Sequence, residues 1–262
     1  MRLRPDESFD LANKVALVTG GATGIGRATC FSLADIGVGT VIVNYRESAA
    51  DADTVARTLT AGGIRAIPMQ ADIADQESVK QLLHRVEVEV GRLDYLVNNA
   101  GTTRLVPFRD LDAITPKIWD QLTATNLYGA FFCCSAAGDL LARNRGAIVN
   151  VASIAGHRAV GSSIPYGVTK AGLLQLTRSL AVTMAPDVRV NSVSAGTVLS
   201  GWHEKLVDSE VFARSAEAEA GVVPLRRLAH PEDIAQAIVS MLLMDFVTGQ
   251  DLIVDGGKSV LY

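Results

Sequence analysis

Residues 14–26 read KVALVTGGATGIG, and this stretch decides the fold. Its first part, residues 14–20, is a short apolar run that ends in glycine, which predicts a buried β-strand. Residues 24–37, GIGRATCFSLADIG, follow with helical spacing and a terminal glycine. A glycine-rich turn between a strand and a helix suits a phosphate, because the helix N-terminus presents free N–H groups and a positive dipole end.

Each glycine of this turn has a separate expected task. Gly20 allows the tight turn, Gly24 lets the backbone approach a phosphate, and Gly26 lets helix and strand pack closely. The alternative interpretation is an ordinary glycine-rich turn. The position between a predicted strand and a predicted helix favours a dinucleotide site.

The same alternation of strand and helix continues along the chain. We expect further strands at 40–46, 64–73, 92–101, 146–153, 188–196 and 250–257, and helices at 52–63, 76–91, 115–143, 165–185 and after Pro231. Nearly continuous apolar strands separated by helices are typical of a parallel sheet with helices on both faces. The prediction is a single doubly wound α/β (Rossmann) domain with a seven-stranded sheet over residues 11–262, preceded by a polar extension, residues 1–10.

Composition excludes several classes of function. The chain has 262 residues, 48% of them hydrophobic, and a net charge of −4 without a long basic block, which argues against nucleic acid or a membrane as a partner. The cysteines Cys30, Cys133 and Cys134 form no disulfide pattern, and no secretory leader is visible, so we expect a cytoplasmic protein. The histidines show no metal-ligand spacing, so no metal is expected; they are His84, His157, His203 and His230.

Residues 164–172, IPYGVTKAG, place Tyr166 and Lys170 one helical turn apart. A phenol has an ordinary pKa of about 10, and a neighbouring ammonium lowers that pKa. The pair therefore predicts a phenol that can release and take up a proton more readily than a free tyrosine. The Tyr-x-x-x-Lys spacing is a weak motif when it stands alone.

Taken together, the motifs resemble the short-chain dehydrogenase/reductase superfamily, and 3-oxoacyl-carrier-protein reductases and related carbonyl reductases in particular. The resemblance covers Leu11 to Gly257. It rests on TGGATGIG (19–26), ADI (71–73), NNAG (98–101), TATNLYGAF (123–131), IVNVASIAG (148–156), the Tyr/Lys pair and VDGG (254–257). The glycine spacing Gly-x-x-x-Gly-x-Gly differs from the commoner dinucleotide fingerprint and agrees with this superfamily.

The resemblance implies a catalytic tetrad of Asn126, Ser153, Tyr166 and Lys170. Ser153 is expected to hydrogen-bond the substrate oxygen, and a water held between Asn126 and Lys170 is expected to relay protons. The implied cofactor-binding residues are Gly20, Thr23, Gly24, Ile25, Gly26, Asn44, Tyr45, Arg46, Asp72, Ile73, Asn99, Ala100, Gly101, Tyr166, Lys170, Gly196, Val198 and Ser200. Ala195 stands where relatives usually have proline, which predicts a looser turn after the sixth strand.

The end of the second strand, VNYRES, predicts NADP in preference to NAD. NAD-preferring relatives usually place an aspartate there, whereas this chain has Asn44, Tyr45 and Arg46. The planar guanidinium of Arg46 suits a 2′-phosphate. Two alternatives stay open: Arg46 is a solvated surface side chain, or Glu47 turns inward and opposes the phosphate.

We predict reduction of a small-molecule ketone, or the reverse reaction, by a homotetramer that pairs helices 115–143 and 165–185. One alternative is a 3-oxoacyl-carrier-protein reductase that docks its carrier on Arg143 and Arg145; the other is a non-catalytic dinucleotide sensor. The pocket is expected to be shaped by 102–108, by 154–163 and by a lid, 197–221. That lid is expected to be an amphipathic helix over the substrate, carrying Trp202, Leu206, Val207, Val211 and Phe212, with packing on the core as the alternative. His157 and His203 are expected to flank the mouth without a catalytic role.

Overall fold

The computed structural model describes residues 11–202 and 208–261, and within them a parallel sheet runs through the centre of the protein. Its seven strands lie in the order β3-β2-β1-β4-β5-β6-β7. They are β1 (Val15–Val18), β2 (Thr40–Tyr45), β3 (Arg65–Gln70), β4 (Tyr95–Asn98), β5 (Ala147–Ser153), β6 (Arg189–Ala195) and β7 (Asp251–Val254). Every pair of neighbours is parallel, so the predicted seven-stranded doubly wound sheet is confirmed.

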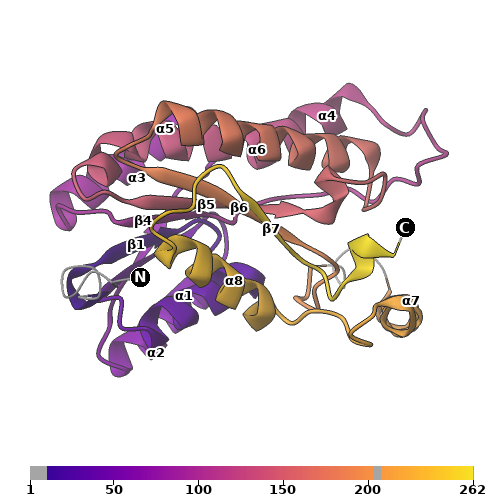
Figure 1. Ribbon diagram of the computed structural model, residues 1–262, viewed down its shortest axis with the longest axis horizontal. Helices are drawn as coiled ribbons and strands as arrows, with labels where there is room; N and C mark the ends of the chain where they lie inside the picture. The colour runs from indigo at the N-terminus through magenta and orange to yellow at the C-terminus, as the bar shows by residue number, and fades with distance from the viewer. Residues whose placement is uncertain (1–10, 203–207, 262) are drawn as a thin grey trace.

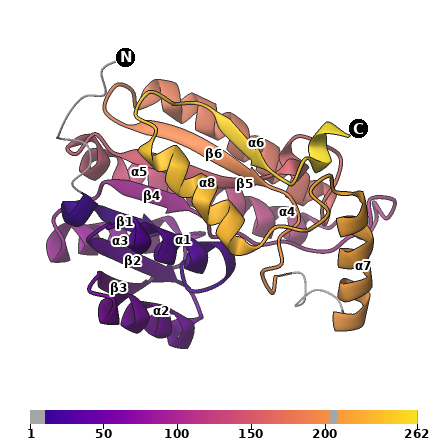
Figure 2. The ribbon, with the colours of Figure 1, turned by 60° about the horizontal axis from the view of Figure 1, so that its bottom comes forward.

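Helices cover both faces of the sheet. The helices are α1 (Gly24–Asp35), α2 (Ala49–Ala61), α3 (Gln76–Glu89), α4 (Pro116–Thr123), α5 (Gly129–Ala142), α6 (Ile164–Thr183), α7 (Ser209–Val222) and α8 (Pro231–Leu243). Figure 1 shows α3, α4, α5 and α6 on one face and α1, α2 and α8 on the other. Figure 2 shows α7 at one end, beside the C-terminal turn η5 (Lys258–Val260).

The inner strands, β2, β1, β4, β5 and β6, are buried on both faces, which explains their nearly continuous apolar sequences, whereas the edge strands β3 and β7 are partly exposed. In β1, Ala16 and Val18 join the core under α1 and α8, whereas Val15 and Leu17 join the core under α3 and α5. Successive side chains of a strand point to opposite faces, so one apolar run supplies two cores.

The sheet order also locates the ligand crevice. The chain leaves β1 toward β2 on one side, and β4 lies on the other side of β1, so the connections diverge at this point. Ligands of open α/β sheets bind at such a switch point, outside the carboxyl ends of the strands.

Two predicted segments differ from the structure. The expected helix 115–143 is divided into α4 and α5 by a π-helical turn, η2 (Ala124–Tyr128), which contains Asn126. The segment 197–230 contains α7, which begins at Ser209 and leaves Trp202 before it. The extension 1–10 and the residues His203, Leu206 and Val207 lie outside the described residues.

Candidate active site

The loop of residues 19–26 joins β1 to the first turn of α1. Gly20 (φ +61°) and Gly24 (φ +53°) adopt left-handed backbone conformations, which glycine reaches without the steric penalty of a Cβ. A Cβ on Gly26 would lie 2.2 Å from the carbonyl oxygen of Gly20, so only glycine permits this approach of helix to loop. The N-cap residue, Thr23, makes no side-chain capping bond, and the first-turn amides point toward the carboxyl edge of the sheet.

The cavity beside this loop, here called the glycine-loop cleft, has a volume of about 550 Å³. The predicted cofactor residues that line it are Gly20, Thr23, Gly24, Ile25, Asn44, Tyr45, Arg46, Asp72, Ile73, Asn99, Ala100, Gly101 and Ser200. Gly26 lies beneath the loop. The remaining predicted cofactor residues, Tyr166, Lys170, Gly196 and Val198, line a neighbouring cavity.

Two side-chain amides of the cleft are engaged by the backbone. Oδ1 of Asn44 accepts from the Gly20 amide at 3.4 Å, and its Nδ2 donates to the Met69 carbonyl at 3.2 Å. The side-chain Nδ2 of Asn99 donates to the Thr19 carbonyl at 2.9 Å. The backbone N–H of Asn99 donates to the hydroxyl of Thr19 at 3.0 Å. These contacts make Asn44 and Asn99 supports of the glycine loop. Thr19 belongs to the same group, and sequence reasoning missed it.

At the end of β2, the guanidinium of Arg46 lies 2.9 Å from the carboxylate of Glu47. Both side chains are exposed, at 54% and 78%. Both residues also line the cleft. Farther along its wall, the Asp72 carboxylate accepts from the amide of Ala74 at 2.9 Å, which fixes the turn after β3.

The neighbouring cavity, here called the tyrosine cavity, lies at the carboxyl ends of β5 and β6 and has a volume of about 120 Å³. All three stretches predicted to shape a pocket contribute to it. The stretch 102–108 supplies Thr103. The stretch 154–163 supplies Ile154, Ala155, Val160, Gly161 and Ser162, and the stretch 197–221 supplies Thr197, Val198, Ser200 and Trp202. The described part of α7 contributes no lining residue to this cavity.

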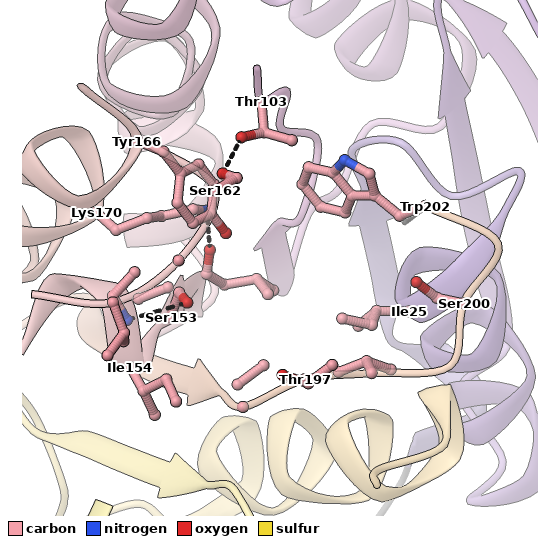
Figure 3. A pocket seen from close by; sticks show the side chains of 18 of the residues that line it. Ile25, Thr103, Ser153, Ile154, Ser162, Tyr166, Lys170, Thr197, Ser200 and Trp202 are labelled. Atoms are coloured by element: carbon pink, nitrogen blue, oxygen red, sulfur yellow. Dashed lines mark hydrogen bonds between the residues drawn. The ribbon is translucent and has the colours of Figure 1, made fainter. Parts of the chain in front are cut away.

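Ser153 and Tyr166 meet in this cavity (Figure 3). Ser153 is the last residue of β5, and its hydroxyl lies close enough to the phenol of Tyr166 to favour the charged phenolate. The Ser153 Oγ also accepts from the Ala155 amide at 3.2 Å. Ser163 caps α6 by accepting from the Tyr166 amide at 3.4 Å, so the helix start fixes the position of the tyrosine.

Lys170 is buried beside the tyrosine. Its Nζ donates to the Val151 carbonyl at 2.7 Å and lies 5.8 Å from the centroid of the Tyr166 ring. Burial disfavours the charged ammonium and lowers the pKa of Lys170 to about 8. The amine therefore titrates close to physiological pH.

The expected lowering of the Tyr166 pKa by Lys170 is corrected by the structure. Burial raises the pKa of the Tyr166 phenol above its ordinary value, and the neighbouring Ser153 hydroxyl opposes this rise only in part. The Lys170 ammonium lies over the ring and is directed at the carbonyl of Val151, so desolvation of the phenolate outweighs attraction to the cation.

Asn126 lies behind this group, in the π-helical turn η2. Its Oδ1 accepts from the Thr102 amide at 2.8 Å, and its Nδ2 donates to the Thr102 carbonyl at 3.0 Å and to the Thr169 hydroxyl at 3.1 Å. The side chain is buried and contacts the residue next to Lys170. Inserted residues of this kind re-aim side chains inside a helix and are frequent at functional sites.

The two cavities share a wall made of Ile25, Asn99, Ser200 and Trp202. Figure 3 shows the Trp202 indole across the cavity from Tyr166 and Lys170. A ligand that extends from the glycine-loop cleft past this wall would reach the hydroxyls of Ser153 and Tyr166. The tail residue Lys258 also lines the tyrosine cavity, and no sequence motif indicated it.

Several other side chains lie away from the two cavities. His157 is 2.8 Å from the Asp251 carboxylate and lines neither cavity. Arg143, which pairs with Glu87 at 2.8 Å, precedes β5, whereas the tyrosine cavity opens where β5 ends. The predicted carrier-docking arginines, Arg143 and Arg145, therefore lie at the wrong edge of the sheet for that role.

Two features are absent from the described ranges, residues 11–202 and 208–261. No helix in these ranges has the length and apolarity needed to cross a bilayer. No cluster of three or more histidine, cysteine or acidic residues in them is arranged to hold a metal ion.

Comparisons with known proteins agree with this arrangement. Residues 20–259 match a family described as enoyl-(acyl carrier protein) reductase. Ketoacyl reductase 2 of the granaticin polyketide synthase from Streptomyces violaceoruber is 41% identical over 248 residues, covering 94% of this chain and 96% of that protein. Cis-4-hydroxycyclohexanecarboxylate dehydrogenase from Sinomonas cyclohexanicum is 39% identical over 255 residues, covering 95% and 98%.

A solved structure extends the likeness to three dimensions. A protein from Burkholderia xenovorans, described as a short-chain dehydrogenase/reductase, superimposes with a TM-score of 0.86 at 29% identity, covering 94% of this chain and 98% of that one. The sequence and structural matches span nearly the whole chain. The chain belongs to the short-chain dehydrogenase/reductase superfamily and is an oxidoreductase acting on CH–OH and C=O groups.

Proposed function

We propose that this protein reduces a ketone to a secondary alcohol with NADPH, using Tyr166, Lys170, Ser153 and Asn126. The observation that carries the proposal is that Ser153, Tyr166 and Lys170 line one cavity, and that this cavity shares a wall with the glycine-loop cleft. The cleft fits a dinucleotide, because its glycines leave room for a pyrophosphate at the N-terminus of α1. A reduced nicotinamide supplies the hydride when it is bound.

In the proposed reaction, the carbonyl oxygen of the substrate is held by the hydroxyls of Ser153 and Tyr166. Tyr166 donates its phenolic proton as negative charge develops on that oxygen, and Ser153 stabilises the charge. Burial keeps the phenol protonated before the reaction, since it raises the pKa of Tyr166. The ammonium of Lys170 then stabilises the phenolate that remains.

Asn126 acts as a positioning residue in this proposal. Its contacts with Thr102 and Thr169 tie the segment after β4 to the helix that carries Tyr166 and Lys170. The expected proton path through a water near Asn126 and Lys170 remains part of the proposal. The reverse reaction uses the same groups, with Tyr166 accepting the proton of the alcohol.

The choice of NADP rests on the end of β2. Arg46 lines the glycine-loop cleft, and the residues Asn44, Tyr45 and Arg46 leave no carboxylate at the position that repels a 2′-phosphate. The side chain of Arg46 is paired with that of Glu47, which is more exposed than Arg46. This ion pair lies at the surface and is therefore weak. A 2′-phosphate offers Arg46 a stronger, doubly hydrogen-bonded partner.

The relatives differ in what their names say they act on: one is a ketoacyl reductase and another a dehydrogenase of a hydroxycyclohexanecarboxylate. Both names describe interconversion of a ketone and an alcohol. The competing hypothesis of a dinucleotide sensor has less support, because the chain retains all four tetrad residues. We expect NADPH absorbance to fall when a panel of ketones is added; tight NADPH binding without turnover of any ketone favours the sensor.

We further propose a homotetramer located in the cytoplasm. Exposed apolar side chains on the helical face formed by η2, α5 and α6, among them Tyr128, Phe131 and Val168, support pairing of these helices between copies. The three cysteines are buried and free, as expected in a reducing compartment.

A further inference from the structure

Two polar side chains of the tyrosine cavity hold the same carboxylate. Thr197 donates its hydroxyl to Oε1 of Glu219 at 2.5 Å, and the ammonium of Lys258 donates to that same oxygen. Thr197 and Lys258 line the cavity, whereas Glu219, which belongs to α7, lies outside the lining. Glu219 therefore contacts two cavity-lining residues from behind.

The backbone keeps this cluster together. The Leu225 amide, just after α7, donates to the Gly256 carbonyl at 3.2 Å, and a Cβ on Gly257 would lie 3.0 Å from Pro224. Figures 1 and 2 both show the C-terminal turn η5 beside α7. The ion pair is partly shielded from water, since the Lys258 and Glu219 side chains are only 30% and 23% exposed.

The charges around the tyrosine cavity decide what Lys258 can bind. Among the described residues, Lys170 and Lys258 are the charged side chains of the lining, and Lys170 is directed at a carbonyl beside Tyr166. Near the tail, Arg158 donates to the Ser259 carbonyl, and Asp255 accepts from the Ser259 amide at 2.6 Å. The carboxylate that pairs with the Lys258 ammonium is that of Glu219.

A substrate could place a free carboxylate against the part of the cavity that Thr197 and Lys258 line. The ammonium it would meet there, that of Lys258, is already paired with Glu219. The substrate would have to displace Glu219 from Lys258, leaving a partly buried carboxylate with Thr197 as its remaining partner, or it would lie against a like charge. Both arrangements are unfavourable. An ester, a thioester or another uncharged group makes neither demand and can accept a hydrogen bond from an ammonium hydrogen of Lys258 that Glu219 leaves free.

We propose that Glu219 is a specificity-determining residue that makes the tyrosine cavity select ketones carrying an uncharged ester or thioester over ketones carrying a free carboxylate. The proposal rests on the proposed ketone reduction and names its substrate class. The expected substrates are therefore of the ketoacyl kind. Selection among them combines exclusion of a free carboxylate with a hydrogen bond to the uncharged ester or thioester.

The test compares 4-oxocyclohexanecarboxylate with its methyl ester, two ketones that differ mainly in charge. For the NADP-bound protein, dissociation constants are measured by calorimetry, and kcat/KM is measured with NADPH. The variants are Glu219→Gln, which keeps the shape and removes the charge, and the matched control Glu217→Gln, an exposed residue on the same helix. Circular dichroism and NADPH titration check that each variant is folded.

We expect the wild type to favour the ester, and Glu219→Gln to shift the ester-to-acid ratio toward the acid by about ten- to a hundredfold, the range of one hydrogen bond to a charged group. Glu217→Gln should leave the ratio within about twofold. A wild type that binds the acid better, or an unchanged ratio in folded Glu219→Gln, overturns the proposal. If neither ketone is turned over, the proposed reduction is in question, while the ratio of dissociation constants still decides the role of Glu219.

Discussion

The glycine-loop cleft and the tyrosine cavity are adjacent, but they are built in different ways. The cleft is formed mainly by the segments at the carboxyl ends of β1, β2, β3 and β4, with residues 200–202 on one side, and its shape depends on backbone conformation at Gly20 and Gly24. The tyrosine cavity combines the end of β5 and the start of α6 with the segment after β6 and the tail residue Lys258. Residues far apart in the chain meet there.

This difference separates two kinds of function. Backbone amides and glycines recognise a phosphate whatever substrate is present, so the cleft serves a cofactor that many enzymes share. The side chains of the tyrosine cavity decide which carbonyl compound is accepted and supply its proton. The two functions should therefore respond independently to substitution.

The largest difference between the effects on turnover and on cofactor binding is expected for Tyr166→Phe, which removes the phenolic hydroxyl and keeps the ring. Turnover should fall by about 10²–10⁴-fold, the usual contribution of general acid catalysis. The dissociation constant for NADPH should change by less than about twofold, because the glycine loop does not contact this hydroxyl. Steady-state rates and fluorescence titrations measure the two effects, with the exposed Tyr128→Phe as control. A variant that retains turnover within about threefold of wild type would remove Tyr166 from the mechanism.

The next effect concerns the buried charge of Lys170, whose pKa is lowered to about 8 from about 10.5. Between these two pH values the unfolded lysine holds a proton that the folded one has lost. The free energy of unfolding therefore rises with pH across this window, and the burial penalty is fully present below pH 8. Over the window, wild type should gain on the order of 3 kcal/mol relative to Lys170→Met.

Denaturant unfolding from pH 7 to pH 10.5 measures this difference. Lys80→Met, at an exposed lysine paired with Glu77, should show no comparable trend against wild type. The phenol of Tyr166 contributes with the opposite sign, because its pKa is raised, but mainly above pH 10 and in both proteins. A constant difference between wild type and Lys170→Met would show that burial does not shift the lysine.

The smallest effect belongs to the cleft. Arg46→Ala should weaken NADP binding by about ten- to a hundredfold and leave NAD binding nearly unchanged, as expected for one hydrogen-bonded contact to a charged phosphate. Arg57→Ala is the matched control, since Arg57 lies on α2 and outside the cleft. Equal losses for both cofactors, or a wild type that prefers NAD, would remove the proposed role of Arg46. Turnover with saturating NADPH should stay close to the wild-type value.

The cleft could be predicted largely from the sequence because its signals are local. The spacing of Gly20, Gly24 and Gly26 reflects backbone constraints within one turn. The position of Tyr166 and Lys170 on one helix likewise follows from helical periodicity. Ser153 and Tyr166 come together because β5 ends and α6 begins at the same edge of the sheet.

The remaining features depend on contacts that no local pattern records. The direction in which the pKa of Tyr166 shifts depends on burial of its phenol. It also depends on the Lys170 ammonium, which donates to the carbonyl of Val151. The π-helical turn at Asn126 interrupts an otherwise regular pattern of helix formers. Glu219 and Lys258 meet only because α7 and the C-terminal tail pack together. The sheet edge at which Arg143 lies follows from the direction of β5, which begins after Arg143.

The central claim is that a hydride passes from the glycine-loop cleft to a carbonyl carbon held beside Tyr166. Its most direct test uses NADPH labelled with deuterium at the transferable position of the nicotinamide, prepared as both stereoisomers, together with a ketone that the protein consumes. We expect one deuterium on the carbinol carbon of the alcohol with one stereoisomer and none with the other, as read by mass spectrometry and NMR. An alcohol free of deuterium with both stereoisomers, or no alcohol from any ketone despite tight NADPH binding, would contradict it.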